Sequence, residues 1–190
     1  FHSPAIVRHA GRIINLTTFL KFSNFHVLKF TSVTSSFFLT ATASSLYDDS
    51  AWEDLAKALK STEELVDISH AGTAMRFLTA YFSVKQNREV ILTGSHRMQN
   101  RPISILVDAL RSLGADISYD KKEGYPPLKI NGREISTSKV KIQGNVSSQY
   151  ISALLLMAPG LKNGLEIELL GKVTSVPYIK MTLALLSDLG

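Results

Sequence analysis

The sequence predicts an α/β fold built from repeated strand–loop–helix units. Three times a strand-like run leads into a polar, glycine-bearing loop and then into a helix-like run, with the loops beginning at Ser69, Gly94 and Gly144. The phrases ALRSLGAD and ALLSDLG repeat one helix ending, which supports a repeated unit. With 45% hydrophobic and 19% charged residues, the 190-residue chain has a globular composition and enough length for one domain, or a domain and part of another.

The individual elements follow from hydrophobic periodicity and from the turn residues that bound each run. The predicted strands span residues 12–18, 64–69, 89–93, 115–119, 128–130, 139–142 and 165–170. The predicted helices span residues 51–60, 77–84, 103–113, 150–157 and 178–189. Residues 19–46, rich in Phe, Ser and Thr, show no consistent period and are expected to mix strand with irregular structure.

Capping residues support several of these boundaries. Asp48 and Asp49 are as well explained as N-cap residues of the helix at 51–60 as by catalysis. Pro102 fits the first turn of the helix at 103–113, and Gly114 fits the position just after its end.

Composition excludes several classes of protein. No run reaches the roughly 18 apolar residues that a spanning helix needs, and residues 1–12 lack the order of a signal peptide, so we expect no membrane segment and a cytoplasmic location. The absence of cysteine excludes disulfides and thiolate ligands. The chain also lacks an initiating Met, which suggests an incomplete sequence.

The net charge of +5 favours an anionic partner. The basic residues are scattered and form no nucleic-acid-binding motif, so a small phosphorylated or carboxylated metabolite is preferred to nucleic acid. No metal-binding cluster and no Ser-His-Asp order is present, so no metal or cofactor is predicted.

The turn from His70 to Arg76 is the first candidate site. Gly72 opens a helix, where unpaired backbone N–H groups and the helix dipole attract an anion, and Arg76 adds a permanent charge. Gly-Thr before a helix is also an ordinary connection, so both interpretations stay open on these residues alone.

Three further loops share this character. Arg97 and Arg101 lie four residues apart, and guanidinium groups suit carboxylate or phosphate, although solvated surface arginines are the common alternative. Ser147, Ser148 and Gln149 offer hydroxyls and an amide to a phosphate, although Ser147 equally suits an N-cap. Ser175 and Tyr178 bracket Pro177 at a further helix start.

Five ordered phrases resemble the 3-phosphoshikimate 1-carboxyvinyltransferase (EPSP synthase) family. They are HAGTAMRFLTA, ILTGSHRMQNRPISILVDALRSLGADI, YPPLKING, VSSQYISALLL and SVPYIKMTLALLSDLG, and together they cover residues 66–190. The resemblance implies repeated βαβαββ units, three in each of two domains, with both substrates bound in the cleft between the domains.

The resemblance also implies ligands for individual residues. Positions matched to shikimate 3-phosphate are Ser147, Ser148, Gln149 and Ser175, with Tyr178 packing nearby. Positions matched to phosphoenolpyruvate are Gly72, Arg97 and Gln149, so Gln149 contacts both ligands. Gly72 also matches the glycine whose replacement by a larger residue excludes the inhibitor glyphosate. His70 and Phe77 stand where many members have Asn and Pro.

Two departures limit what the resemblance implies. The family's early Lys-Ser-x-Ser-Asn-Arg motif is matched only in part: Lys21 aligns with its lysine, but Phe25 takes the arginine position, so residues 19–47 are atypical. The family's catalytic acid and base residues are expected beyond Gly190, in a second domain. We therefore expect an N-terminal strand segment at 1–18, most of one substrate-binding domain at 19–190, and no second, catalytic domain.

The expected function is transfer of the enolpyruvyl group of phosphoenolpyruvate to the 5-hydroxyl of shikimate 3-phosphate in aromatic amino-acid biosynthesis. Alone, these residues are expected to be inactive, and the surface facing a partner domain would favour self-association in a family that is usually monomeric. One alternative is a degenerate remnant that binds shikimate 3-phosphate weakly or not at all. A related transferase acting on UDP-N-acetylglucosamine is disfavoured because its usual cysteine is missing, and a nucleic-acid binder is disfavoured by the scattered charge.

Overall fold

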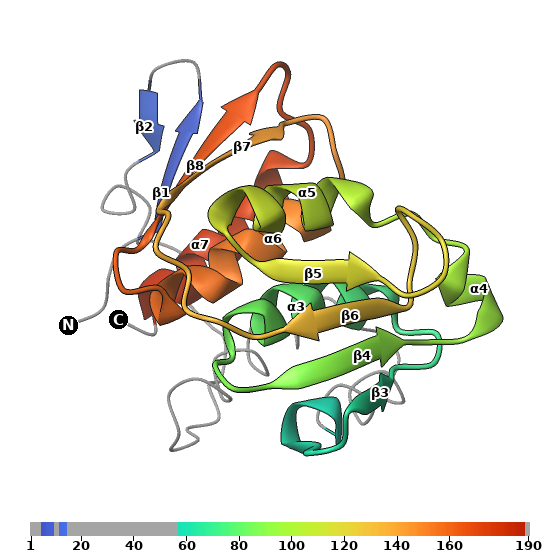
Figure 1. Ribbon diagram of the computed structural model, residues 1–190. Helices are drawn as coiled ribbons and strands as arrows, with labels where there is room; N and C mark the ends of the chain where they lie inside the picture. Colours follow the sequence, from blue (N-terminus) through green and yellow to red (C-terminus); the bar gives the residue numbers. More distant parts are fainter. Residues whose placement is uncertain (1–4, 10–11, 15–56, 189–190) are drawn as a thin grey trace.

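Two four-stranded sheets form the framework of this computed structural model, which describes residues 5–9, 12–14 and 57–188 (Figure 1). The first sheet has the order β2-β1-β8-β7, with β1 at Ala5–His9, β2 at Arg12–Ile14, β7 at Lys139–Gln143 and β8 at Leu165–Leu170. The second has the order β3-β4-β6-β5, with β3 at Leu65–Asp67, β4 at Glu89–Thr93, β5 at Asp116–Tyr119 and β6 at Leu128–Asn131.

Both sheets are mixed, and each has parallel strands from which the polar loops leave. In the first sheet β8 runs parallel to β1 on one side and to β7 on the other, while β2 is antiparallel to β1. In the second, β3 and β4 are parallel, and β6 is antiparallel to both β4 and β5. The loop after a strand and the loop after its parallel neighbour therefore leave from the same edge of the sheet.

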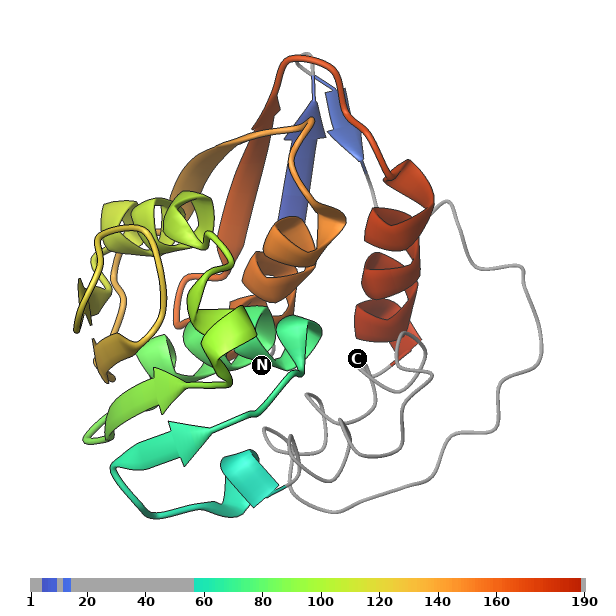
Figure 2. The ribbon, with the colours of Figure 1, turned by 90° about the vertical axis from the view of Figure 1, so that its right-hand side faces the viewer.

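Five α-helices are assigned in the described residues from β3 onward. Their bounds are Gly72–Val84 for α3, His96–Gln99 for α4, Ser104–Leu113 for α5, Ser148–Met157 for α6 and Val176–Asp188 for α7. A 3₁₀ turn, η2, follows α6 at Ala158–Gly160. Helices α3, α5 and α6 lie between the two sheets (Figure 1), and Figure 2 shows α7 beside α6.

The helices carry most of the core. Every residue of α6 from Tyr150 to Met157 is buried, because its sequence is apolar on almost every side and it packs against both α3 and α7. Helix α3 is likewise buried from Ala74 to Ser83. The starts of α3 and α6 are thus held by a packed interior.

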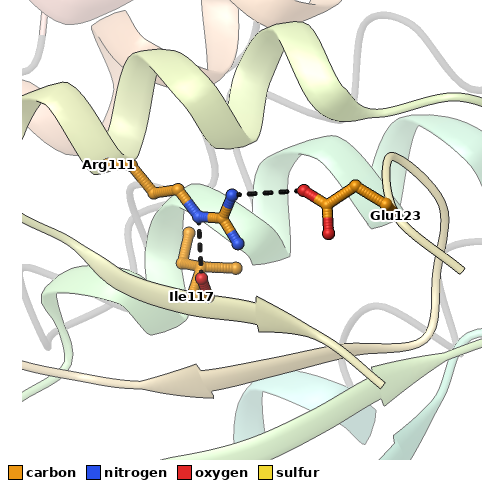
Figure 3. A network of polar contacts seen from close by, with 3 residues as sticks. All are labelled: Arg111, Ile117 and Glu123. Carbon is orange, nitrogen blue, oxygen red and sulfur yellow. Dashed lines mark hydrogen bonds and ion pairs between the residues drawn. The ribbon is translucent and has the colours of Figure 1, made fainter. Parts of the chain in front are cut away.

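A polar contact fixes α5 to the sheet beside it. The Arg111 Nε donates to the Ile117 carbonyl at 2.9 Å, and Arg111 Nη1 lies 3.6 Å from the Glu123 carboxylate (Figure 3). This contact ties the end of α5 to β5 and to the loop that follows β5. Gly114 ends α5 with φ of 103°, which confirms its predicted place.

The predicted α/β class is confirmed, and helix α3 begins at Gly72, as predicted for the turn from His70 to Arg76, so the helical run at 77–84 is its later part. Three other helices begin at residues other than those predicted. Helix α6 begins at Ser148, two residues earlier than predicted. Helix α5 begins at Ser104, because the Ile103 N–H donates to the Gly124 carbonyl at 2.9 Å, so Pro102 lies before the helix. Helix α7 begins two residues earlier than predicted.

The two N-terminal strands differ from the sequence prediction. Strand β1 was not predicted, and β2 covers the first three residues of the strand predicted at 12–18. In the part of the chain that is described, no helix has the length and apolar character to cross a membrane.

Several predictions fall on residues that the structure does not describe. The predicted helix at 51–60 is helical at 57–60, and its remainder lies outside the described residues. Lys21, Phe25 and the whole atypical tract 19–47 also lie outside them. At the other end, α7 is described as far as Asp188, so Gly190 lies outside the described residues too. The partial match of Lys21 to the lysine motif and the expectation of catalytic groups beyond Gly190 therefore stay predictions.

Candidate functional site

Four polar loops follow parallel strands and lead into helices α3, α4, α6 and α7. The first two are joined directly, because the Ser95 N–H donates to the Ser69 carbonyl at 2.9 Å and Ser95 Oγ lies 2.8 Å from His70 Nδ1. A Cβ on Gly94 would lie 2.7 Å from the Ser69 carbonyl oxygen, so this approach requires glycine. The last two loops are joined by the Thr174 N–H, which donates to the Gly144 carbonyl at 2.9 Å.

A side-chain hydrogen bond joins the starts of α3 and α6. The Gln149 Nε2 donates to Thr73 Oγ1 at 2.9 Å, although the two residues are 76 positions apart in the sequence. Gln149 belongs to the serine-rich loop, and Thr73 follows Gly72. The structure therefore brings Gln149, which the family resemblance matched to both ligands, next to the turn that contains Gly72.

The start of α6 presents hydroxyl groups to solvent. Ser147 caps the helix, and its Oγ accepts from the Gln149 N–H at 3.4 Å. Ser147 is exposed, while Ser148 and Gln149 are half-buried. Both predicted interpretations of Ser147 are therefore compatible with its position, because a capping hydroxyl that is exposed still has acceptor and donor capacity.

The start of α7 has an unusual backbone. Ser175 is exposed and has φ of 56°, a left-handed conformation that is uncommon for residues other than glycine. The Tyr178 N–H donates to the Ser175 carbonyl at 3.1 Å, and the Tyr178 side chain is 58% exposed. In the described part of the chain, the link from this loop to the α6 loop is the backbone contact of Thr174, and no hydrogen bond joins the Ser175 hydroxyl to Ser147 or Ser148.

Gly72 is the first residue of α3 and is crowded by arginines. A Cβ on Gly72 would overlap Arg101 Nη1 and would lie 3.1 Å from Arg101 Cζ and 3.0 Å from Arg76 Nη1. The absence of a side chain at Gly72 therefore gives the Arg101 guanidinium its space.

Arg76 lies at the turn, as the sequence suggested, but its guanidinium is buried. It is only 6% exposed, its Nη1 donates to the Gly72 carbonyl at 2.7 Å, and its Cζ lies 5.9 Å from the Tyr150 ring centroid. The Arg76 Nε has no hydrogen-bond partner among the described residues. Sequence reasoning missed that this guanidinium is buried, although the four-residue spacing from Gly72 places both on one helical face.

Arg97 and Arg101 add two exposed cations at the same place. Burial lowers the pKa of Arg101, and repulsion from Arg76 and then Arg97 lowers it further. The loop that carries them is held by the Tyr150 hydroxyl, which donates to the Pro102 carbonyl at 3.0 Å. Tyr150 and Thr73, which position the site, carried no distinguishing signal in the sequence.

The donors at this edge suit an oxyanion. They are helix N-termini, hydroxyls, an amide and guanidinium groups, which together neutralise and orient phosphate or carboxylate. Within the described ranges, no group of three or more His, Asp or Glu residues is placed to hold a metal ion. A separate surface pocket, lined by residues that include Val84, Arg133 and Leu161, contains none of the predicted site residues.

Comparison with known proteins gives one consistent family. Residues 39–190 match the family model described as EPSP synthase (3-phosphoshikimate 1-carboxyvinyltransferase). A 3-phosphoshikimate 1-carboxyvinyltransferase from Bacteroides fragilis is 54% identical over 147 residues, which cover 77% of this chain and 36% of that protein. One from Haemophilus influenzae is 53% identical over 125 residues, which cover 65% of this chain and 29% of that protein.

A solved structure supports the fold. The EPSP synthase from Acinetobacter baumannii superposes with a TM-score of 0.52 at 21% identity, over 62% of this chain and 26% of that one. The chain spans about a third of the length of the curated relatives it matches, with 36% of the Bacteroides fragilis protein covered. By its sequence over most of its length, and in agreement with its fold, the chain belongs to the EPSP synthase family.

Proposed function

We propose that this chain contributes substrate-binding residues of a 3-phosphoshikimate 1-carboxyvinyltransferase. The reaction transfers the enolpyruvyl group of phosphoenolpyruvate to the 5-hydroxyl of shikimate 3-phosphate and releases phosphate. The observation that carries the proposal is the 2.9 Å hydrogen bond between Gln149 and Thr73, because it holds Gln149, which is proposed to contact both substrates, against the residue that follows Gly72. A two-substrate reaction needs its ligands side by side.

Shikimate 3-phosphate is proposed to bind at the starts of α6 and α7. Ser147 and Ser148 would donate hydroxyl hydrogen bonds to its phosphate, with the amide of Gln149 beside them. Ser175 and Tyr178 would contact the same ligand from α7. The exposure of Ser147, Ser175 and Tyr178 supports this assignment, because each is accessible to a ligand from solvent.

Phosphoenolpyruvate is proposed to bind at the start of α3. Gly72 would leave the start of α3 free of a side chain, which makes room for the anion and for the arginines around it. Arg97 would pair with a ligand anion, and Gln149 would contact both ligands. The positive charge of the neighbouring Arg76 and Arg101 supports an anionic ligand here.

The chemistry is addition followed by elimination. In the addition, C3 of phosphoenolpyruvate gains a proton, and the 5-hydroxyl loses its proton as its oxygen bonds to C2. In the elimination, the tetrahedral intermediate loses phosphate from C2 and a proton from C3, which restores the double bond. Fixed cations and helix N-termini lower the cost of the phosphate and carboxylate charges, so we propose that the reaction uses no cofactor. The acid and base groups that move the protons are proposed to lie beyond Gly190, with residues 19–190 supplying most of one substrate-binding domain.

Calorimetric titration of the 190-residue chain with shikimate 3-phosphate tests this proposal. We expect binding at millimolar concentration or tighter, lost in Ser148→Ala and kept in Ser118→Ala, which removes an exposed hydroxyl on the distant strand β5. Absence of heat from the folded wild-type chain would instead identify a remnant without a working site. Equal loss of binding in Ser148→Ala and Ser118→Ala would mean that the ligand does not bind at the start of α6.

A further inference from the structure

The start of α3 holds three arginines that form no ion pair with an acidic residue of the described chain. Arg76 lies beside Gly72, Arg101 lies over it, and Arg97 is close enough to lower the pKa of Arg101. Among the ion pairs of residues 57–188, none involves these three guanidinium groups. Like charges gathered without a counter-ion repel one another, so the arrangement is stabilised when an anion binds between them.

Arg76 and Arg101 differ in how firmly they are held. Arg76 is anchored by the Gly72 carbonyl and the Tyr150 ring, and its buried Nε lacks a partner within the described residues. Arg101 is exposed, and its backbone is held by its N–H, which donates to the Met98 carbonyl at 3.0 Å. Arg76 therefore supplies a fixed charge beneath the ligand position. Within the described residues no hydrogen bond or ion pair holds the Arg101 guanidinium, so it can turn toward a ligand above Gly72.

We propose that Arg101 is a further anion-binding residue of this site, contacting the same phosphate or carboxylate as Arg97, and that Gly72 is needed because its missing Cβ leaves room for the Arg101 guanidinium. The inference rests on the proposed function, in which phosphoenolpyruvate is the anion, and adds to it a residue and a reason for the glycine. A planar guanidinium over the open backbone of Gly72 can meet two oxygens of one anion at once.

The role of Gly72 follows from which atoms a side chain would meet. The closest are the tip of Arg101 and the Arg76 Nη1, both on long side chains, and no backbone atom is as near. Gly72→Ala is therefore tolerated by the fold but displaces Arg101 from its position. The Gly72→Ala substitution therefore weakens anion binding by moving Arg101. It has no such effect in a variant in which Arg101 is already replaced by alanine.

The first experiment is a titration of the isotope-labelled chain with phosphoenolpyruvate, followed by the amide signal of Gly72. Arg101→Ala is expected to weaken binding about tenfold or more, because it removes a charge-assisted hydrogen bond to the anion. The affinity of Arg101→Lys is expected to lie between those of wild type and Arg101→Ala, since lysine keeps the charge but lacks the parallel N–H groups of the guanidinium. Arg133→Ala, which removes an exposed arginine away from the site, is the matched control.

The outcomes separate the inference from the proposed function. If Arg97→Ala weakens binding while Arg101→Ala behaves like Arg133→Ala, the role of Arg101 is overturned and the proposed site stands. If Arg101→Ala weakens binding and Arg97→Ala does not, the assignment of Arg97 fails and that of Arg101 stands. If the folded wild-type chain does not bind phosphoenolpyruvate, both fail.

A double-mutant cycle tests the reason for the glycine. We expect Gly72→Ala to weaken binding in the wild-type background and to have little further effect in the Arg101→Ala background. Additive losses would mean that the added methyl group acts on the ligand directly and not through Arg101, which would overturn this part of the inference.

Discussion

Ser147 combines two tasks in one hydroxyl group. Its Oγ caps α6 by accepting from the Gln149 N–H, and in the proposed function the same hydroxyl donates to a phosphate. The tasks are compatible because a hydroxyl has both a donor hydrogen and acceptor lone pairs. A side chain that accepts hydrogen bonds but cannot donate them would keep the capping role and lose the phosphate-binding role.

Substitution of Ser147 should therefore divide stability from binding. Ser147→Ala is expected to lower the free energy of unfolding by about 1 kcal/mol through loss of the cap. Ser147→Asp is expected to keep the cap and the stability, yet abolish binding of shikimate 3-phosphate because two anions repel. Urea unfolding and calorimetry of both variants are the measurements, and an aspartate variant that binds like wild type would argue against a phosphate contact here.

Among the elements, helices α6 and α7 are joined by a buried polar pair. Ser152 Oγ and Thr182 Oγ1 lie 2.8 Å apart, and Thr182 Oγ1 also donates to the Tyr178 carbonyl at 3.1 Å. The side chains are 5% and 4% exposed. This contact helps to set the position of α7, and with it Ser175 and Tyr178, relative to the start of α6.

The two hydroxyls should respond unequally to replacement. Ser152→Ala leaves Thr182 its bond to Tyr178, so we expect a loss of about 1 kcal/mol, whereas Thr182→Val strands the Ser152 hydroxyl and is expected to cost about 1–3 kcal/mol. The double variant should cost less than the sum, because no buried hydroxyl is then left alone. Thermal unfolding of the three variants gives the comparison, and strict additivity would contradict the coupling.

At strand β5, burial raises the pKa of Tyr119 to about 12 from its usual value of 10.0, with a nearby Asp108 adding to the rise. The folded chain thus holds the phenol proton more tightly than the unfolded chain does. The stability from this proton is present below about pH 10 and is lost as pH rises toward 12.

Replacement of Tyr119 isolates that effect. The Tyr119 hydroxyl has no hydrogen-bond partner within the described ranges, so Tyr119→Phe is expected to change stability by less than about 1 kcal/mol at neutral pH. Above about pH 10 the phenylalanine variant should lose stability less steeply than wild type. Urea unfolding at several pH values on both sides of this point measures the difference, and parallel curves would contradict the raised pKa.

The helices and strands differ in how well the sequence alone predicted them. Strand β8 at Leu165–Leu170, which alternates buried and half-buried residues, and the short apolar strand β4 at Glu89–Thr93 were predicted with their observed bounds, because their local sequence is enough to identify them. Strand β1 was missed. Its pairing with the distant β8 leaves no local signal, although it also pairs with β2, which follows it closely in the chain. The start of α5 was misplaced for a similar reason, since a contact with Gly124 sets it.

At the scale of the whole molecule, the site depends on contacts between distant segments. Hydrogen bonds from Gln149 to Thr73 and from Tyr150 to Pro102 bring the α6 loop to the α3 and α4 loops. The sequence supplied the residue types and, through the family resemblance, their proposed ligands. It did not supply the burial of Arg76 or the position of Arg101 over Gly72, because both follow from packing between loops.

The activity of these 190 residues alone follows from the same arrangement. The residues proposed to bind the two substrates offer hydroxyls, an amide and guanidinium groups, which bind anions but are poor acids and bases near neutral pH. We therefore expect no turnover when both substrates are supplied. A coupled phosphate-release assay measures this, and robust turnover by the purified chain would contradict it.

A crystal structure of this chain with shikimate 3-phosphate bound would show directly whether the start of α6 is the phosphate site. We expect the phosphate group within hydrogen-bond distance of Ser147 and Ser148, with the Gln149 amide beside the ligand and its hydrogen bond to Thr73 either retained or replaced by one to the ligand. A ligand bound away from the start of α6, or a well-ordered site left empty at saturating ligand, would show that these residues do not bind the phosphate.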